Sequence, residues 1–208
     1  MLNLTELPIV DLDPELTLID GPFGKSIEHP LVKEVFYAKE MNHLYNEQLR
    51  LRKDKCQEAL RKKDWHGYIW WHERPYRFNA FREVRQNMTD QEYWEVLREV
   101  WTDSENIWQN QQLWEECLLV PRPNEHFFMT AEEKEYLDSL PEVITIHRGY
   151  QRTPKGFSYS LSKTKARWFA NRFSKQGKVK SIRVRKSEVF AFVDSRSEKE
   201  IIYLGGKS

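Results

Sequence analysis

The segment "VITIHRGY", residues 143–150, marks the point at which the sequence pattern changes from helical to extended. Ile144, Ile146 and Arg148 fall on alternate positions, which is the pattern of a strand with one buried face. Four later segments also have the length and composition of strands, namely "SYSLS" (158–162), "VKSIRVR" (179–185), "VFAFV" (189–193) and "IIYL" (201–204). Residues 143–208 are therefore predicted to form a small β-rich region.

One helix is predicted inside this region, with Ser162 as its N-terminal cap. Its apolar residues follow the i, i+3, i+4, i+7 spacing of a buried helix face. The residues of this face are Ala166, Phe169, Ala170 and Phe173. We expect all four side chains to pack against the strands.

The region before it, residues 31–142, is predicted to be helical. Apolar residues recur every three or four positions from Leu31, which indicates a helix over about 31–63. Three capping-box patterns mark further helix starts, and they pair Thr89 with Glu92, Thr102 with Glu105 and Thr130 with Glu133. The helices that follow are expected over about 90–101, over about 103–119 and up to about Leu140.

Four tryptophans of these helices fall near heptad spacing, at positions 94, 101, 108 and 114. Tryptophans at helical spacing usually belong to a core, so we interpret them as buried packing residues instead of a stacking platform. Residues 1–30 contain four prolines and are predicted to form an extended arm with turns. The expected fold class is α+β, in which the helical N-terminal part packs on the β-rich region as one compact unit.

Composition limits the classes of protein that the chain could belong to. A chain of 208 residues, 13% aromatic and 31% charged, can build one good hydrophobic core. No apolar stretch has the length of a membrane span, and the acidic N-terminus does not resemble a signal peptide. With only Cys56 and Cys117, we expect a cytoplasmic protein whose free thiols pack within helices.

Charge is distributed very unevenly along the chain. Residues 143–208 hold 16 Lys and Arg against 4 Asp and Glu, a net +12, whereas residues 1–142 hold 17 against 28, a net −11. Either the two regions dock on each other or the basic region binds an anionic ligand, such as nucleic acid or the phosphates of a dinucleotide. A solvated basic face is the third interpretation.

Two glutamates, Glu198 and Glu200, directly precede the apolar run "IIYL". A carboxylate at the mouth of a buried strand is costly to desolvate unless it has a partner or a chemical role. An arginine at the end of a strand suits phosphate, Ser-x-Ser presents two hydroxyls on one face, and a glutamate can stabilise positive charge at an anomeric carbon. A reaction that cleaves a charged N-glycoside, such as the nicotinamide–ribose bond of NAD, needs these groups.

The ordered segments "HRG" (147–149), "FSYSLS" (157–162) and "EKEII" (198–202) resemble the Arg…Ser-Thr-Ser…Glu-x-Glu signature of the mono-ADP-ribosyltransferases. That family includes arginine-modifying bacterial toxins and phage transferases that modify host proteins. The resemblance implies that the chain uses NAD as a substrate and modifies a target protein, as an effector in the cytoplasm of a host cell. It covers residues 143–204, less than a third of the chain.

The resemblance also implies individual roles. Arg148, with Gly149 beside it, would hold an NAD phosphate, and Ser158 would order the catalytic glutamate and the nicotinamide ribose. Ser160 would match the last motif serine, and Tyr159 replaces the middle threonine. Glu200 would bind the ribose 2′-hydroxyl as the catalytic glutamate, Glu198 would activate the acceptor guanidinium, and "DSRS" (194–197) would belong to the loop that recognises the target. Arg148 and Ser158 are only ten positions apart, so the cover of the NAD pocket must be absent or come from the N-terminal helices.

Other interpretations of the same residues stay open. Arg148 could pair with a helix carboxylate, and the two glutamates could protect an edge strand against aggregation. Functional alternatives are NAD hydrolysis with water as acceptor, or a nucleic-acid-binding or protein-binding module without enzymatic activity. No metal site is expected, because His66, His72 and His126 lack metal-ligand spacing, and no Gly-rich phosphate loop is present.

Overall fold

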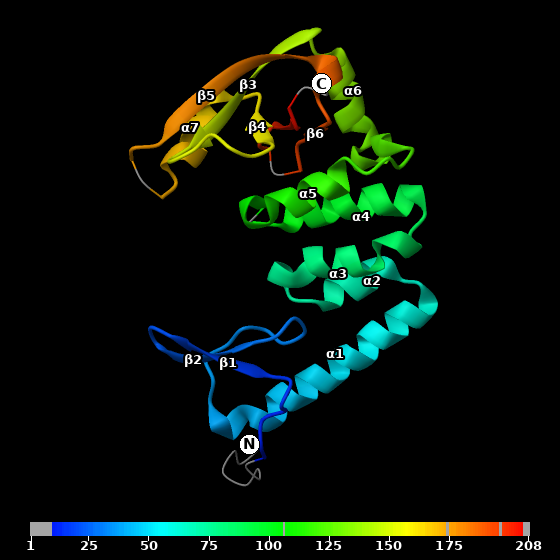
Figure 1. Ribbon diagram of the computed structural model, residues 1–208, viewed down its shortest axis with the longest axis vertical. Helices are drawn as coiled ribbons and strands as arrows, with labels where there is room; N and C mark the ends of the chain where they lie inside the picture. Colours follow the sequence, from blue (N-terminus) through cyan, green and yellow to red (C-terminus); the bar gives the residue numbers. More distant parts are fainter. Residues whose placement is uncertain (1–9, 106, 174, 196, 206–208) are drawn as a thin grey trace. The chain divides into compact units, whose positions relative to one another are not determined.

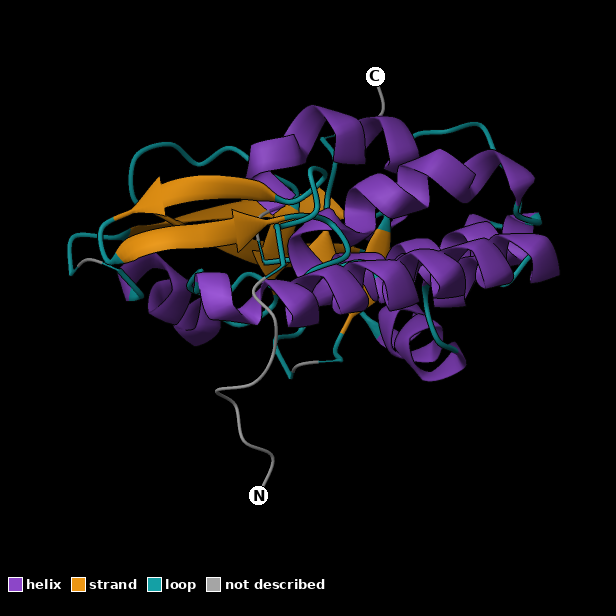
Figure 2. Ribbon diagram, turned by 90° about the horizontal axis from the view of Figure 1, so that it is seen from below, coloured by secondary structure: helices purple, strands orange, loops and turns teal. Residues whose placement is uncertain are grey.

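The protein is mixed helix and sheet, and a computed structural model describes residues 10–105, 107–173, 175–195 and 197–205. The chain divides into two compact units, Met1–Met88 and Thr89–Ser208. In the described ranges the strands form one two-stranded hairpin and one five-stranded sheet, and helices supply most of the remaining regular structure (Figure 2). The hairpin belongs to the first unit and the sheet to the second.

The first unit joins its hairpin to a long helix. Strands β1 (Thr17–Gly21) and β2 (Gly24–Glu28) lie within the predicted extended arm and pair antiparallel. Three α-helices follow, and they are α1 (Asn42–Lys62), α2 (Trp65–Trp71) and α3 (Arg77–Val84), with short 3-10 turns at Lys39–Met41, Arg74–Tyr76 and Arg85–Asn87. The hairpin forms because Leu16 and Ile27 are buried in a cluster with Tyr45 and Leu49 of α1.

The prediction that this helix begins near residue 31 was wrong. Helix α1 begins at Asn42, so about the first third of the predicted helix is not α-helical. Residues 32–37 instead add to the hairpin, since the amide of Ile27 donates to the carbonyl of Val35 at 3.1 Å and the amide of Tyr37 donates to that of Lys25 at 2.8 Å. Pairing with a neighbouring strand therefore overrides the helical periodicity there. The far end agrees with the prediction, because Lys63 closes the helix in the left-handed conformation, with φ 56°.

The second unit contains a five-stranded antiparallel sheet in the order β5-β3-β4-β7-β6 (Figure 1). Its strands are β3 (Val143–Tyr150), β4 (Ser158–Ser160), β5 (Lys178–Arg185), β6 (Ala191–Val193) and β7 (Glu200–Ile202). Each strand lies within or next to a segment predicted to be extended. The long pair of β3 and β5 is continuous from Val143 opposite Arg185 to Tyr150 opposite Lys178.

The helices of this unit are α4 (Asp90–Asp103), α5 (Gln111–Leu118), α6 (Ala131–Ser139) and α7 (Lys163–Asn171), with 3-10 turns η5 (Ile107–Asn110), η6 (Glu125–Phe128) and η7 (Lys186–Glu188). Thr89 and Thr130 form complete capping boxes, as predicted. The capping box predicted at Thr102 was wrong. Its hydroxyl donates to the carbonyl of Glu99 at 2.9 Å, because α4 continues past it to Asp103.

The two faces of the sheet have different neighbours. One face builds a core with Leu137 of α6, and its buried residues include Ile144, Ile146, Tyr159 and Ile201. Helix α7 packs on the other side of β3 at Gly149, where an added Cβ would lie 2.0 Å from the carbonyl oxygen of Ala166. This contact requires glycine, since no side chain fits between strand and helix.

Two predictions of buried aromatic residues need correction. Phe173 is 82% exposed because α7 ends at Asn171, before the predicted apolar stripe is complete. Trp94, Trp101 and Trp114 are almost fully buried, but Trp108 is 68% exposed because it lies in the turn η5 and not on a continuous helix.

The charge asymmetry lies entirely within the second unit. Residues 89–142 hold 3 Lys and Arg against 14 Asp and Glu, the whole net −11, whereas residues 1–88 hold 14 of each and are neutral. The acidic helices and the basic strands thus belong to one compact unit. Lys186 links them directly, because its Nζ donates to the carbonyls of Asp138 at 2.8 Å and Leu140 at 3.0 Å.

None of the helices described here is both long enough and apolar enough to cross a lipid bilayer. Cys56 in α1 and Cys117 in α5 are buried, and neither forms a disulfide. Burial raises the pKa of Cys56 to about 11, so its thiol is protonated and unreactive at neutral pH.

Candidate functional site

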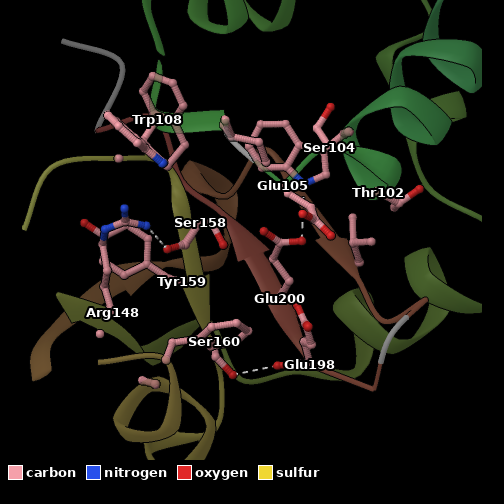
Figure 3. A pocket seen from close by; sticks show the side chains of 18 of the residues that line it. Thr102, Ser104, Glu105, Trp108, Arg148, Ser158, Tyr159, Ser160, Glu198 and Glu200 are labelled. Carbon is pink, nitrogen blue, oxygen red and sulfur yellow. Dashed lines mark hydrogen bonds between the residues drawn. The ribbon is translucent and has the colours of Figure 1, made fainter. Parts of the chain in front are cut away.

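A cavity of about 490 Å³ opens in the second unit, within the size range of small-molecule sites (Figure 3). Its walls come from the end of α4, the turn η5, strand β3, the segment entering β4, helix α7 and the loop between β6 and β7. Every residue that the sequence predicted for the site lines this cavity: Arg148, Gly149, Ser158, Tyr159, Ser160, Glu198 and Glu200. The fold therefore brings together three motifs that are separated along the chain.

Glu200 is the first residue of β7 and pairs with Ser160 of β4 on one side and Val193 of β6 on the other. Its carboxylate oxygen Oε2 accepts a hydrogen bond from the indole Nε1 of Trp101, at 3.2 Å. Trp101 is only 1% exposed, so this donor is held rigidly by the core of the helices. The periodicity of α4 predicted Trp101 as a core residue, but nothing in the sequence indicated a partner 99 positions away.

Glu198 lies in the loop before β7. Glu198 and Glu200 are two positions apart, but they do not share the face of one strand, because Ser197 and Lys199 are left-handed, with φ of 53° and 48°, and interrupt the extended backbone. The loop is fixed by Asp194, whose carboxylate accepts from the amide of Lys199 at 2.8 Å. Both glutamates line the cavity through this loop geometry and not through strand alternation.

The two motif serines have different environments. The hydroxyl of Ser160, which is buried, donates to the carbonyl of Glu198 at 2.7 Å and accepts from the amide of Ser162 at 3.0 Å (Figure 3). This hydroxyl therefore connects β4 to the loop of Glu198 and to the start of α7. Ser158 is partly exposed and faces the cavity wall beside Arg148.

Arg148 holds the segment that enters β4. Its guanidinium donates to the carbonyls of Ser158 and, at 2.7 Å, of Lys155. Gly156 has a φ of +124°, and a Cβ there would lie 2.2 Å from the guanidinium, so glycine makes room for this contact. Burial lowers the pKa of Arg148, an effect opposed by Tyr159 and Glu200. The partners of Arg148 are carbonyls and not a helix carboxylate.

His147 also lines the cavity, and the sequence reasoning assigned it no role. It pairs with Ser160 on β4 and with Ser181 on β5. Its Nδ1 lies 2.7 Å from the hydroxyl of Ser181. Burial and the charge of Lys163 lower its pKa, so the imidazole is neutral at pH 7.

Aromatic side chains line the outer part of the cavity. Trp108 of η5 and Trp168 of α7 line it, and they are 68% and 57% exposed. The guanidinium carbon of Arg172 lies 5.7 Å from the centre of the Trp168 ring. Exposed indole faces next to a cation suit the stacking of a heteroaromatic ring near an anionic group.

No group of three or more His, Cys, Asp or Glu side chains suited to a metal ion occurs in the ranges that the structure describes. The side chains that line the cavity offer carboxylates, an imidazole, hydroxyls and guanidinium groups. Comparisons with protein families, with curated proteins and with solved structures found no match to this chain.

Proposed function

We propose that this protein transfers ADP-ribose from NAD to a macromolecular acceptor, a protein arginine. One observation carries the proposal: Glu200, at the head of β7 and paired with Ser160, shares a cavity with Arg148, Ser158 and Glu198. These residues occur in the order of the mono-ADP-ribosyltransferase signature, and they come from three segments of the chain. The finer description of the fold as an ADP-ribosyltransferase-like core belongs to this proposal.

The reaction breaks the bond between ribose C1′ and the nicotinamide nitrogen. Nicotinamide leaves with the bonding electron pair as a neutral molecule, so positive charge develops on the ribose. The Glu200 carboxylate would bind the 2′-hydroxyl and stabilise that charge, and the Trp101 indole, 3.2 Å from Oε2, would fix its orientation. A preorganised carboxylate in a partly buried site is the main requirement of this step.

The acceptor would approach from the side of Glu198. A carboxylate next to the reaction centre can pair with an arginine guanidinium and hold one nitrogen toward C1′. The loop of residues 194–197 would contact the target protein, although Arg196 lies outside the described residues. By analogy with the phage transferases, the target would be a protein in the cytoplasm of a host cell.

The short segment between Arg148 and Ser158 raised the question of what covers the NAD pocket. Trp101 and Thr102, at the end of α4, and Trp108, in η5, line the same cavity as Arg148 and Ser158. They support the expectation that N-terminal helices supply the cover. Arg172 and the partly exposed aromatic rings beside it provide contacts suited to the adenine and phosphates of NAD.

A second candidate is binding of nucleic acid without catalysis. It is favoured by the surface of α7, where Lys163, Lys165 and Arg167 are exposed on the same helix as Trp168. Exposed aromatic rings among cations are typical of single-stranded nucleic-acid sites. Such binding should weaken steeply with salt, whereas binding of one dinucleotide in a cavity should respond much less.

The test of the proposed activity is release of nicotinamide from NAD, together with mass spectrometry of labelled species in a cell lysate. Glu200→Gln should reduce release by a hundredfold or more, since about 3–4 kcal/mol of transition-state stabilisation is lost. Glu95→Gln is the matched control, because Glu95 is an exposed carboxylate of α4 in the same unit and does not line the cavity. Wild-type release by Glu200→Gln would exclude the enzymatic proposal.

NAD hydrolysis, with water as the acceptor, can be separated from transfer by the second glutamate. Glu198→Gln should keep nicotinamide release and lose most labelling of protein, because water needs no guanidinium-binding carboxylate. The two products are measured in the same reaction. If Glu198→Gln lost nicotinamide release and protein labelling equally, Glu198 would not act on the acceptor alone.

A further inference from the structure

We propose that His147 is the group that takes the proton from the attacking acceptor during transfer. This inference rests on the proposed function and adds a catalytic residue to it. In the segment "HRG" the resemblance gives a role to Arg148 and Gly149 but none to His147, which lines the cavity beside them.

His147 belongs to a row of residues that runs across the sheet. Ser181 of β5 pairs with His147 of β3, His147 pairs with Ser160 of β4, and Ser160 pairs with Glu200 of β7. Residues directly paired in an antiparallel sheet project from the same face. His147 and Glu200 therefore flank Ser160 on the cavity side, with their Cα atoms about 10 Å apart, two steps of about 5 Å each.

The hydroxyl of Ser160 cannot easily serve the substrate, since it is bonded to the carbonyl of Glu198 and the amide of Ser162. A ligand above Ser160 would instead meet the carboxylate of Glu200 on one side and the imidazole of His147 on the other. The cavity as a whole, about 490 Å³, lies within the size range of sites for small molecules.

The imidazole ring of His147 is oriented by one hydrogen bond. Ser181 engages Nδ1 at 2.7 Å, and within the described part of the chain no side chain or carbonyl bonds Nε2. If Ser181 accepts from Nδ1–H, then Nε2 carries the lone pair, which is the tautomer of a base. Ser181 thus holds the ring from the edge strand and leaves its second nitrogen for the contents of the cavity.

The transfer step requires a base. The acceptor guanidinium forms a bond from one nitrogen to ribose C1′, nicotinamide leaves with the electron pair of the broken bond, and the guanidinium gives up one proton. His147 would receive this proton on Nε2 and pass it to solvent. Glu198 would keep its role of binding the guanidinium.

Imidazole is better suited to this proton than the neighbouring carboxylates. General bases work best when their pKa is near the working pH, and ordinary carboxylates titrate two to three units below it. Lys163 on α7 is the charged group that acts on the pKa of His147, and the other charged side chains of the cavity lining are Glu105, Arg172, Glu198 and Glu200, besides Arg148. Arg148 follows it on β3 but engages carbonyls at the entrance of β4.

The experiment measures kcat and KM for transfer to a small alkylguanidine from pH 5 to 9, together with nicotinamide release. His147→Gln should lower kcat for transfer about a hundredfold, with little change in the KM for NAD. The wild-type rate should rise with pH through the pKa of His147 and then level, and this rise should be absent in His147→Gln. His126→Gln, which changes a histidine of the same unit outside the cavity, is the matched control.

Ser181→Ala provides a second variant that leaves the imidazole in place. It should lower kcat several-fold and move the midpoint of the pH rise, because the ring loses its bond at Nδ1. A wild-type pH profile and rate in His147→Gln, with active wild-type protein, would overturn this inference and leave the proposed function intact. Absence of nicotinamide release by the wild-type protein would overturn both.

Discussion

At the scale of single residues, the environment of Glu200 explains how a carboxylate is tolerated at the mouth of a buried strand. One oxygen accepts the Trp101 indole N–H, and the residue opens β7 next to a cavity. A charged group with a hydrogen-bond partner and access to the cavity avoids most of the cost of burial. The same contact positions the carboxylate, so it is a sensitive point for mutation.

Trp101→Phe removes the donor and keeps most of the aromatic volume. We expect kcat for nicotinamide release to fall about tenfold to a hundredfold, because a hydrogen bond to a charged group contributes about 1.5–3 kcal/mol. The KM for NAD should change little. Trp114→Phe is the control, since Trp114 is equally buried and packs edge-on against Trp101, with ring centres 5.2 Å apart.

A drop in thermal stability with unchanged kcat would contradict the positioning role of Trp101. That result would instead make Trp101 a packing residue only. Steady-state kinetics and thermal unfolding of the two variants together separate the roles.

At the scale of elements, Glu133 joins three parts of the second unit. Its carboxylate accepts from Arg98 of α4 at 3.2 and 2.8 Å, from the amide of Thr130 at 2.9 Å and from the amide of Asp194 at 2.9 Å. The sequence marked Glu133 only as the third residue of a capping box. The structure adds that it anchors the beginning of the loop that carries Glu198.

Glu133→Gln should therefore destabilise the second unit by about 3–5 kcal/mol, because it leaves the mostly buried guanidinium of Arg98 without its counter-charge. The measurement is urea unfolding followed by circular dichroism. Glu92→Gln, at the same position of the exposed capping box of α4, should cost about 1 kcal/mol or less. Equal losses in both variants would show that the anchoring contacts of Glu133 add nothing.

At the scale of the whole molecule, three histidines link stability to pH. The pKa values of His29, His72 and His147 are all lowered, in each case chiefly by burial. The unfolded chain takes up these protons near pH 6.5, whereas the folded chain resists them until lower pH. The stabilisation is fully present above about pH 6.5 and is lost as the pH falls through the folded pKa values.

The free energy of unfolding should thus decrease between about pH 6.5 and 5, by up to about 1.4 kcal/mol per pH unit for each histidine. His72→Gln should reduce this slope, because His72 is the most buried of the three, at 9% exposure. Urea unfolding at several pH values measures the slope. A free energy that stays constant over this range would contradict the prediction.

Local patterns determined much of the fold. Alternation and short continuous apolar runs predicted the strands of residues 143–204, the capping boxes at Thr89 and Thr130 predicted two helix starts, and Ser162 predicted a third. These signals need only neighbouring residues, because backbone periodicity and capping act over three or four positions. The candidate residues of the site were found the same way, as short motifs in a fixed order.

Long-range packing decided what local patterns could not. Residues 32–37 pair with the hairpin although their apolar residues have helical spacing. Helix α4 extends to Asp103, past the capping box that was predicted at Thr102. The bond from Trp101 to Glu200 and the row from Ser181 through His147 to Glu200 depend on strand order and on segments far apart in the chain. Such contacts arise when burial of apolar surface brings distant segments together, so only the tertiary structure assigns Trp101 and His147 to the cavity.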